Sequence, residues 1–133
     1  MTLKESDKDI LIQHRITQSK EALENVQFLL ENKKLSLASN RVYYAIFYII
    51  SAVAIKNDFS TSKHKQLLGW FNKNYIATNK ISNNYSKIIY EAYSNREKSD
   101  YDFLFELTLD EINYLYENVK EFVEIIMKKI LLN

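Results

Sequence analysis

The spacing of apolar and polar positions predicts helices along most of the chain. A first segment, about residues 7–33, places apolar residues at three- and four-residue intervals and so predicts an amphipathic helix. This stripe consists of Ile12, Ile16, Leu23, Val26 and Leu30. A second segment, Leu37–Lys56, is apolar on nearly every side from Val42 onward. We therefore expect the other helices to surround this second helix.

Three further helices are predicted over about residues 63–75, 82–101 and 109–131. The apolar residues on one face of each are expected to point into a common core. They are Leu67, Leu68, Phe71 and Tyr75, then Tyr85, Ile88, Ile89 and Ala92, and finally Ile112, Leu115, Val119, Phe122, Ile126 and Ile130.

Polar residues mark two of the predicted helix starts. Ser36 precedes the apolar second helix and is a candidate N-cap. Thr108 and Glu111 have the spacing of a capping box, in which each side chain satisfies a free backbone amide of the first turn. Helices beginning at both residues are therefore expected.

The composition favours the same all-α fold. Sheets and long ordered loops usually need proline and glycine at their turns, whereas this chain of 133 residues has no proline and one glycine, Gly69. Its length suits one domain with its own core. We expect a single domain over residues 1–133, an antiparallel bundle of four long helices and one short helix.

Composition also excludes several classes of function. The absence of cysteine rules out disulfides and thiolate chemistry, and two histidines far apart in the sequence give no zinc motif. No glycine-rich phosphate loop and no G-x-S-x-G motif are present, so conventional kinases, dinucleotide-binding enzymes and hydrolases are not indicated. No metal and no cofactor is expected.

Charge and hydropathy give no sign of a membrane protein. The chain has 18 basic and 17 acidic residues, a balance that does not suggest broad electrostatic capture of nucleic acid or lipid. Residues 1–7 lack the apolar stretch of a signal peptide, and the apolar run 42–55 is shorter than the roughly 20 residues that span a bilayer. We expect a cytoplasmic protein.

Two groups of residues in the first half of the chain are candidates for chemistry. Arg41, Tyr44 and Tyr48 fall on one helix face; they either pack, with Arg41 paired to a carboxylate, or line a cleft in which Arg41 contacts a phosphate. Lys63 and His64 stand at a predicted helix start, where free amides suit an anion. His64 either packs there or transfers a proton near neutral pH.

The third group is the segment from Arg96 to Tyr101. Arg96 and Asp100 are four residues apart and can pair on a helix surface, with Lys98 and Tyr101 nearby. Such a pair contributes only a few tenths of a kcal/mol to stability. An arginine held by a carboxylate beside a phenol is also suited to bind a phosphate.

Together these segments resemble the HEPN domain family. The similarity covers nearly the whole chain: the long first helix, the sequence RVYYAIF at residues 41–47, SKHK at 62–65 and REKSDY at 96–101. The chain is most similar to the small stand-alone bacterial branch of the family, in which an arginine of the fourth helix is followed by Asp-Tyr. Four separate features agree with the family in the same order along the chain.

The resemblance implies an RNA-directed function. HEPN domains are often metal-independent ribonucleases that act as homodimers, with the fourth-helix motifs of two protomers facing one cleft. Many are toxins paired with a small nucleotidyltransferase antitoxin. In some of these systems the antitoxin adds nucleotides to a tyrosine of the toxin's motif, and Tyr101 is the nearest equivalent here, at a different spacing.

One departure from the family pattern leaves the activity open. Catalytic members carry a histidine four to six residues after the arginine, and no histidine follows Arg96. Cleavage through the 2′-hydroxyl needs a general base, for which His64, Asp100 and Tyr101 are the candidates, although pairing with Arg96 weakens Asp100 as a base. The hypotheses are a ribonuclease of a toxin–antitoxin or defence-type system, a non-catalytic RNA- or nucleotide-binding module, and a structural dimerising domain. Arg41, Tyr44, Lys63 and Lys98 are the predicted substrate contacts.

Overall fold

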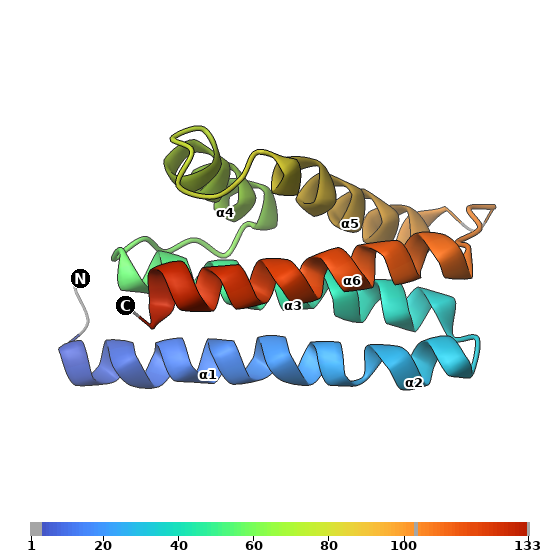
Figure 1. Cartoon of the computed structure of the whole chain (residues 1–133), viewed down its shortest axis with the longest axis horizontal. Coiled ribbons are helices and arrows are strands. Elements are labelled where there is room, and N and C mark those ends of the chain that lie inside the picture. The colour runs from blue at the N-terminus through green and yellow to red at the C-terminus, as the bar shows by residue number, and fades with distance from the viewer. Residues whose placement is uncertain (1–3, 103, 133) are drawn as a thin grey trace.

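The chain folds as an all-α bundle, as the sequence predicts. The computed structural model describes residues 4–102 and 104–132, and no strand occurs among them. The α-helices are α1 (Glu5–Glu24), α2 (Val26–Glu31), α3 (Leu35–Lys56), α4 (His64–Phe71), α5 (Asn84–Tyr101) and α6 (Leu109–Ile126). Two single π-helical turns, η1 (Asn72–Ile76) and η2 (Met127–Leu131), extend α4 and α6. Figure 1 shows α1, α3 and α6 lying side by side along the long axis.

The predicted first helix is divided in two. Asn25 separates α1 from α2 but keeps right-handed helical dihedral angles, φ −80° and ψ −16°. The two pieces therefore follow nearly one axis (Figure 1). The apolar stripe crosses this break, because Ile16, Val26 and Leu30 are all buried.

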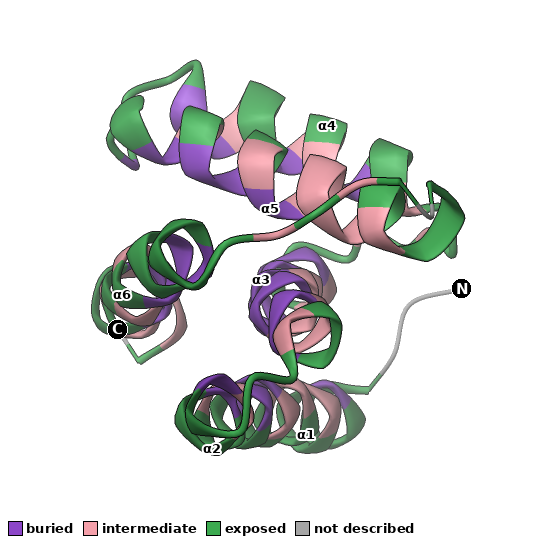
Figure 2. Cartoon of the chain, turned by 90° about the vertical axis from the view of Figure 1, so that its right-hand side faces the viewer, coloured by how far each residue is buried: buried purple, intermediate pink, exposed green. Residues whose placement is uncertain are grey.

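Helix α3 lies at the centre of the molecule. Figure 2 shows it between α1 and α2 on one side and α5 on the other, with α6 beside it. Among the described residues, α3 is the one helix long and apolar enough to cross a membrane. Within its most apolar stretch, 61% of the residues are buried by the rest of the chain. Its apolar character is thus accounted for by its place as the core helix.

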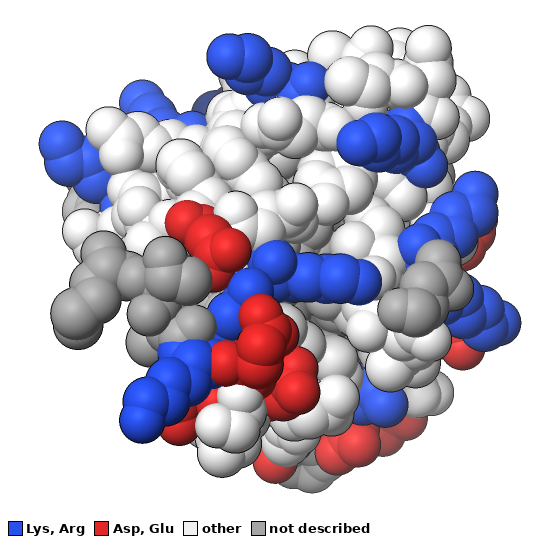
Figure 3. Space-filling view, turned by 90° about the vertical axis from the view of Figure 1, so that its left-hand side faces the viewer, with Lys and Arg blue, Asp and Glu red and all other residues white. Residues whose placement is uncertain are grey.

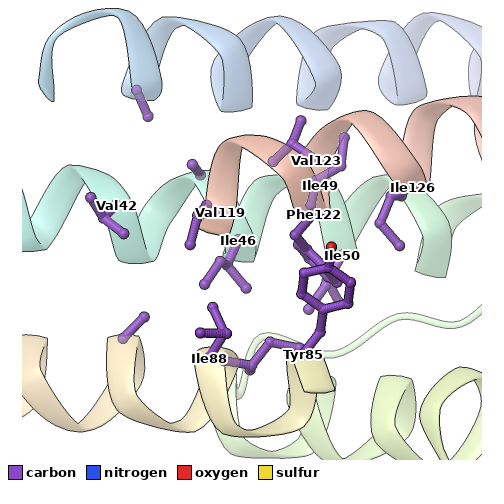
Figure 4. Close-up of a cluster of buried hydrophobic side chains, with 14 of the residues drawn as sticks. Val42, Ile46, Ile49, Ile50, Tyr85, Ile88, Val119, Phe122, Val123 and Ile126 are labelled. Carbon is purple, nitrogen blue, oxygen red and sulfur yellow. The ribbon is translucent and has the colours of Figure 1, made fainter. Parts of the chain in front are cut away.

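The core is built from the three faces that the sequence pattern predicts. Figure 4 shows Ile46 and Ile50 of α3 close to Phe122 of α6 and to Tyr85 and Ile88 of α5. Phe122 is fully buried, and its ring centroid is 5.3 Å from that of Tyr85. These contacts hold α5 against α3, which places the polar end of α5 beside the tyrosines of α3.

One predicted cap is confirmed and the other is wrong. Thr108 caps α6, because its hydroxyl accepts a hydrogen bond from the backbone N–H of Glu111 at 3.2 Å. Ser36 does not cap α3: the helix begins two residues earlier than predicted, at Leu35, with Lys34 at the N-cap position. The cause is a tight turn in which Lys33 takes a left-handed conformation, φ 57°, so the chain enters the helix sooner. The Ser36 hydroxyl instead bonds to that of Ser99 on α5, at 2.6 Å.

Acidic and basic side chains are mixed at one end of the molecule. Figure 3 shows both signs side by side on the end of the molecule where α1 begins and α3 ends. One such pair, Lys8 and Asp58, ties α1 to the loop after α3 at 3.2 Å. This end of the molecule therefore carries no continuous basic field, consistent with the net charge of +1.

Candidate functional site

The centre of the site is Arg96, which α5 places against two tyrosine rings of α3. Its guanidinium carbon lies 5.5 Å from the ring centroid of Tyr44 and 5.7 Å from that of Tyr43. Its Nη2 donates to the Tyr44 hydroxyl at 3.5 Å, the outer limit of a hydrogen bond. The Arg96 side chain is 21% exposed. The cation is thus held mainly by aromatic faces and still reaches solvent.

Asp100 holds Arg96 from the same helix. The Arg96 Nε and the Asp100 Oδ2 are 3.1 Å apart, which confirms the predicted pairing of these residues. The ε N–H of Arg96 is nevertheless buried without a well-aligned acceptor among the described residues. Distance alone makes this an ion pair, and its geometry is not that of a hydrogen bond. Arg96 therefore keeps hydrogen-bonding capacity that the surrounding side chains do not fill.

His64, from the start of α4, lies in the same aromatic cluster. Its ring stacks on Phe47 at a centroid distance of 4.1 Å, and its Nδ1 is 2.6 Å from the Tyr43 hydroxyl. Its ring edge also meets Tyr44, at 5.9 Å between centroids. The packing that the sequence suggested for His64 is therefore present. The same packing brings His64 to the two tyrosines that hold Arg96.

The protonation of this cluster follows from its surroundings. Burial, and secondarily the positive charge of Arg96, lowers the pKa of His64 from its ordinary value of 6.5. Burial raises the pKa of Tyr43, so its phenol stays protonated. Two histidine tautomers fit the bond to Tyr43. In the one whose Nδ1–H donates to the phenol oxygen, Nε2 has a free lone pair and can accept a proton.

The lowered pKa of His64 predicts a pH dependence of stability. Because the folded state binds this proton more weakly than the unfolded chain, the contribution of His64 to stability is full above pH 6.5 and falls as the pH drops toward the folded pKa. An NMR titration of the imidazole should give a midpoint below 6.5, and Arg96→Gln should raise that midpoint. A His64 midpoint at or above 6.5 would contradict the described environment.

The predicted face of Arg41, Tyr44 and Tyr48 is present next to Arg96. The guanidinium of Arg41 lies 5.4 Å from the Tyr44 ring centroid, and the ring of Tyr48 lies 5.6 Å from the same ring. The prediction that Arg41 pairs with a carboxylate is wrong. The Nε and Nη2 of Arg41 donate instead to the side-chain oxygen of the neighbouring Asn40, at 3.2 and 2.9 Å. Tyr44 therefore has an arginine from each of two helices against its ring.

Three predicted residues lie outside this cluster. Lys63 is the exposed N-cap residue of α4, and Lys98 lies over the ring of Phe105 at 5.6 Å. Tyr101 ends α5 with 80% of its surface exposed. No direct contact joins any of the three to Arg96 in the part of the chain that the structure describes.

Several members of the cluster were not among the residues predicted for the site. Tyr43 and Phe47 were recognised as part of a motif but not as neighbours of His64. Tyr93 was not singled out; its ring lies 5.7 Å from that of Tyr43, and its hydroxyl donates to Glu97 Oε2 at 2.8 Å. Helical spacing could have identified Tyr93, because Tyr93, Arg96 and Asp100 stand at i, i+3 and i+7 and therefore share one face of α5.

The comparison with known proteins agrees with this architecture. A family profile described as "HEPN domain" matches residues 12–130. A "UPF0332 protein" of Thermotoga maritima is 30% identical over 118 residues, which cover 89% of this chain and 84% of the relative. Two proteins of Methanocaldococcus jannaschii, each named "putative toxin", are 31% identical over 100 residues and 33% identical over 97 residues. These matches cover 75% and 71% of this chain, and 68% and 72% of the respective relatives. The chain therefore belongs to the HEPN domain family.

Proposed function

We propose that this chain is the toxin-like member of a toxin–antitoxin or defence-type system and acts on RNA in the cytoplasm. The observation that carries the proposal is the position of Arg96, held on the rings of Tyr43 and Tyr44 and in reach of solvent beside His64. The relatives named "putative toxin" support the biological setting. Because the net charge of the chain is only +1, RNA is recognised locally at this site rather than by a broad basic surface.

The proposed chemistry is cleavage of RNA without a metal ion. The 2′-hydroxyl oxygen attacks the adjacent phosphorus, its proton passes to a base, and the bond from phosphorus to the 5′-oxygen breaks. The products are a 2′,3′-cyclic phosphate and a 5′-hydroxyl, which receives a proton. Nε2 of His64 is the proposed base, since its lowered pKa keeps the ring neutral at pH 7. Arg96 stabilises the charge that develops on the phosphoryl oxygens.

The other predicted residues take supporting roles. Asp100, which is paired with Arg96, orients the guanidinium and does not itself act as the general base or the general acid. Arg41 and Tyr44 extend the contact surface along α3 for a neighbouring phosphate and base. Lys63 and Lys98 are exposed cations at its margins that can contact the backbone of a longer RNA.

The test is incubation of purified protein with tRNA and mRNA in excess EDTA. Cleavage that leaves 2′,3′-cyclic phosphate ends supports the enzyme. A metal requirement, or 5′-phosphate products, would refute the proposed chemistry.

A non-catalytic RNA- or nucleotide-binding module is the second candidate. The observation favouring it is that His64 is stacked and hydrogen-bonded, while no histidine follows Arg96 on α5. This module would bind the same RNA through Arg96 and leave it intact. Binding without cleavage, measured in the same samples by gel shift, separates the two functions.

We also propose a homodimer in which the α5 motifs face each other. Large apolar side chains that remain exposed on α5 and at the start of α6 support this arrangement; they are Tyr90 and Leu109. Sedimentation at the monomer mass across the micromolar range would exclude it.

A nucleotidyltransferase antitoxin is the proposed partner, with Tyr101 as its target. Tyr101 is 80% exposed at the end of α5, which leaves its side chain accessible to another protein. In the proposed step the phenol oxygen attacks the α-phosphorus of ATP, pyrophosphate leaves, and the phenol proton passes to solvent. Mass spectrometry after incubation with the partner and ATP should place the added nucleotide on Tyr101. Tyr101→Phe should abolish the addition, and Tyr114→Phe, another exposed tyrosine, should not. Modification of the Tyr101→Phe variant to the same extent would contradict the assignment.

A further inference from the structure

A cavity that does not include Arg96 lies next to Phe47. A cavity of about 650 Å³ opens between α1, α3 and the loop 57–63. This volume is in the range of small-molecule sites. Its apolar wall contains Leu11, Phe47, Ile55, Phe59 and Leu67. The ring of Phe47 also stacks on His64, so the cavity adjoins the first site without containing Arg96.

The charged group in this cavity is Arg15. Its Nη1 donates to the neutral side-chain oxygen of Gln18 at 2.7 Å. Its ε N–H is buried and has no acceptor among the described residues. No carboxylate in the described part of the chain lies within 4.0 Å of its guanidinium. Arg15 therefore lines the cavity with a positive charge that no described carboxylate balances, and an oxyanion in the cavity would balance it.

The carboxylate that lines the cavity does not neutralise Arg15. Asp58 is paired with Lys8, whose Nζ is 3.2 Å from Asp58 Oδ1. With Asp58 balanced in this way, the unbalanced charge of the cavity is the guanidinium of Arg15. The side chains of Ser60 and Ser62 add hydroxyl groups to the rim.

We propose that this cavity binds a small planar organic anion, with its oxyanion group on Arg15 and its ring against Phe47 and Phe59. The apolar wall selects the ring, and Arg15 selects a phosphate or a carboxylate over a neutral head group. The site is independent of the proposed action on RNA, because neither Arg96 nor His64 lines it.

The experiment uses the full chain and phenyl phosphate as the probe, followed by NMR. The Arg15 Nε–H resonance should shift saturably in the parent protein, and Arg15→Gln should weaken binding by at least about 10-fold. Lys20→Gln, which removes a cation from the same helix outside the cavity, should leave the affinity within about two-fold, as should Arg96→Ala. Inorganic phosphate, which lacks the ring, and phenol, which lacks the charge, should each bind more weakly than phenyl phosphate. Comparing the affinity of benzoate with that of phenyl phosphate shows whether the cavity prefers a carboxylate or a phosphate as the head group.

Three results would overturn the proposal. They are the absence of a saturable shift up to about 10 mM probe, equal affinity of the parent and Arg15→Gln, and loss of binding in Arg96→Ala with retention in Arg15→Gln. The last result would assign the probe to the first site. Because the Arg15 resonance is followed in the parent itself, the test stands even if Arg15→Gln fails to fold.

Discussion

Replacing Arg96 with alanine is expected to reduce RNA cleavage by about 100- to 1000-fold, the usual effect of removing one group that stabilises transition-state charge. The guanidinium is the cation that the tyrosine rings of α3 hold beside His64, and alanine leaves no donor there. Initial rates on labelled tRNA in EDTA measure the effect. Under the alternative function, the same substitution should weaken RNA binding, with no cleavage by either protein.

Lys87→Ala is the matched control for this prediction. Lys87 is a cation on the same helix, and it also pairs with a carboxylate four residues away, Glu91, at 3.7 Å. It is 78% exposed and lies outside the aromatic cluster, so its removal should leave the rate within about two-fold. Circular dichroism of both variants checks that the fold is retained. Equal rates for the parent and Arg96→Ala would contradict the assigned role.

Phe122→Ala is expected to lower the free energy of unfolding by about 3–5 kcal/mol. Phe122 is fully buried where α6 meets α5 and the end of α4, with its ring 5.3 Å from Tyr85 and 5.8 Å from Phe71. The loss is a large share of the roughly 5–15 kcal/mol of a typical domain. Urea unfolding followed by circular dichroism measures it.

The matched control is Tyr114→Ala on the same helix. Tyr114 is 55% exposed, so its removal should change the stability by no more than about 0.5 kcal/mol. A loss for Phe122→Ala as small as that of Tyr114→Ala would mean that the contact between α5 and α6 is not part of the core.

The helices and their buried faces could be predicted because periodicity and burial are local properties of the sequence. Tyr85, Ile88 and Ala92 were assigned inward from their spacing alone, and all are buried. The start of α3 was misplaced for a different reason. A capping preference competes with the geometry of the preceding turn, and the left-handed Lys33 decided the start of the helix.

The site could be predicted only in parts. Arg96 with Asp100 on α5, and Arg41 with Tyr44 on α3, follow from helical spacing within one helix. The contact between His64 and Tyr43 joins residues 21 positions apart on different helices. It depends on how α4 folds back over α3, which no local pattern specifies. Tyr101 could likewise be named from its motif, but the motif does not specify where the side chain lies, and in the structure it is exposed outside the cluster.

The central claim is that Arg96 and His64 form one site for an RNA phosphate. The most direct measurement is the NMR shift of the His64 imidazole on addition of a short single-stranded RNA that is 2′-O-methylated and so cannot be cleaved through its 2′-hydroxyl. We predict a saturable shift in the parent and its loss in Arg96→Ala, with His14 unaffected in both. An RNA that binds without shifting the His64 resonance, or that shifts it equally in Arg96→Ala, would contradict the claim.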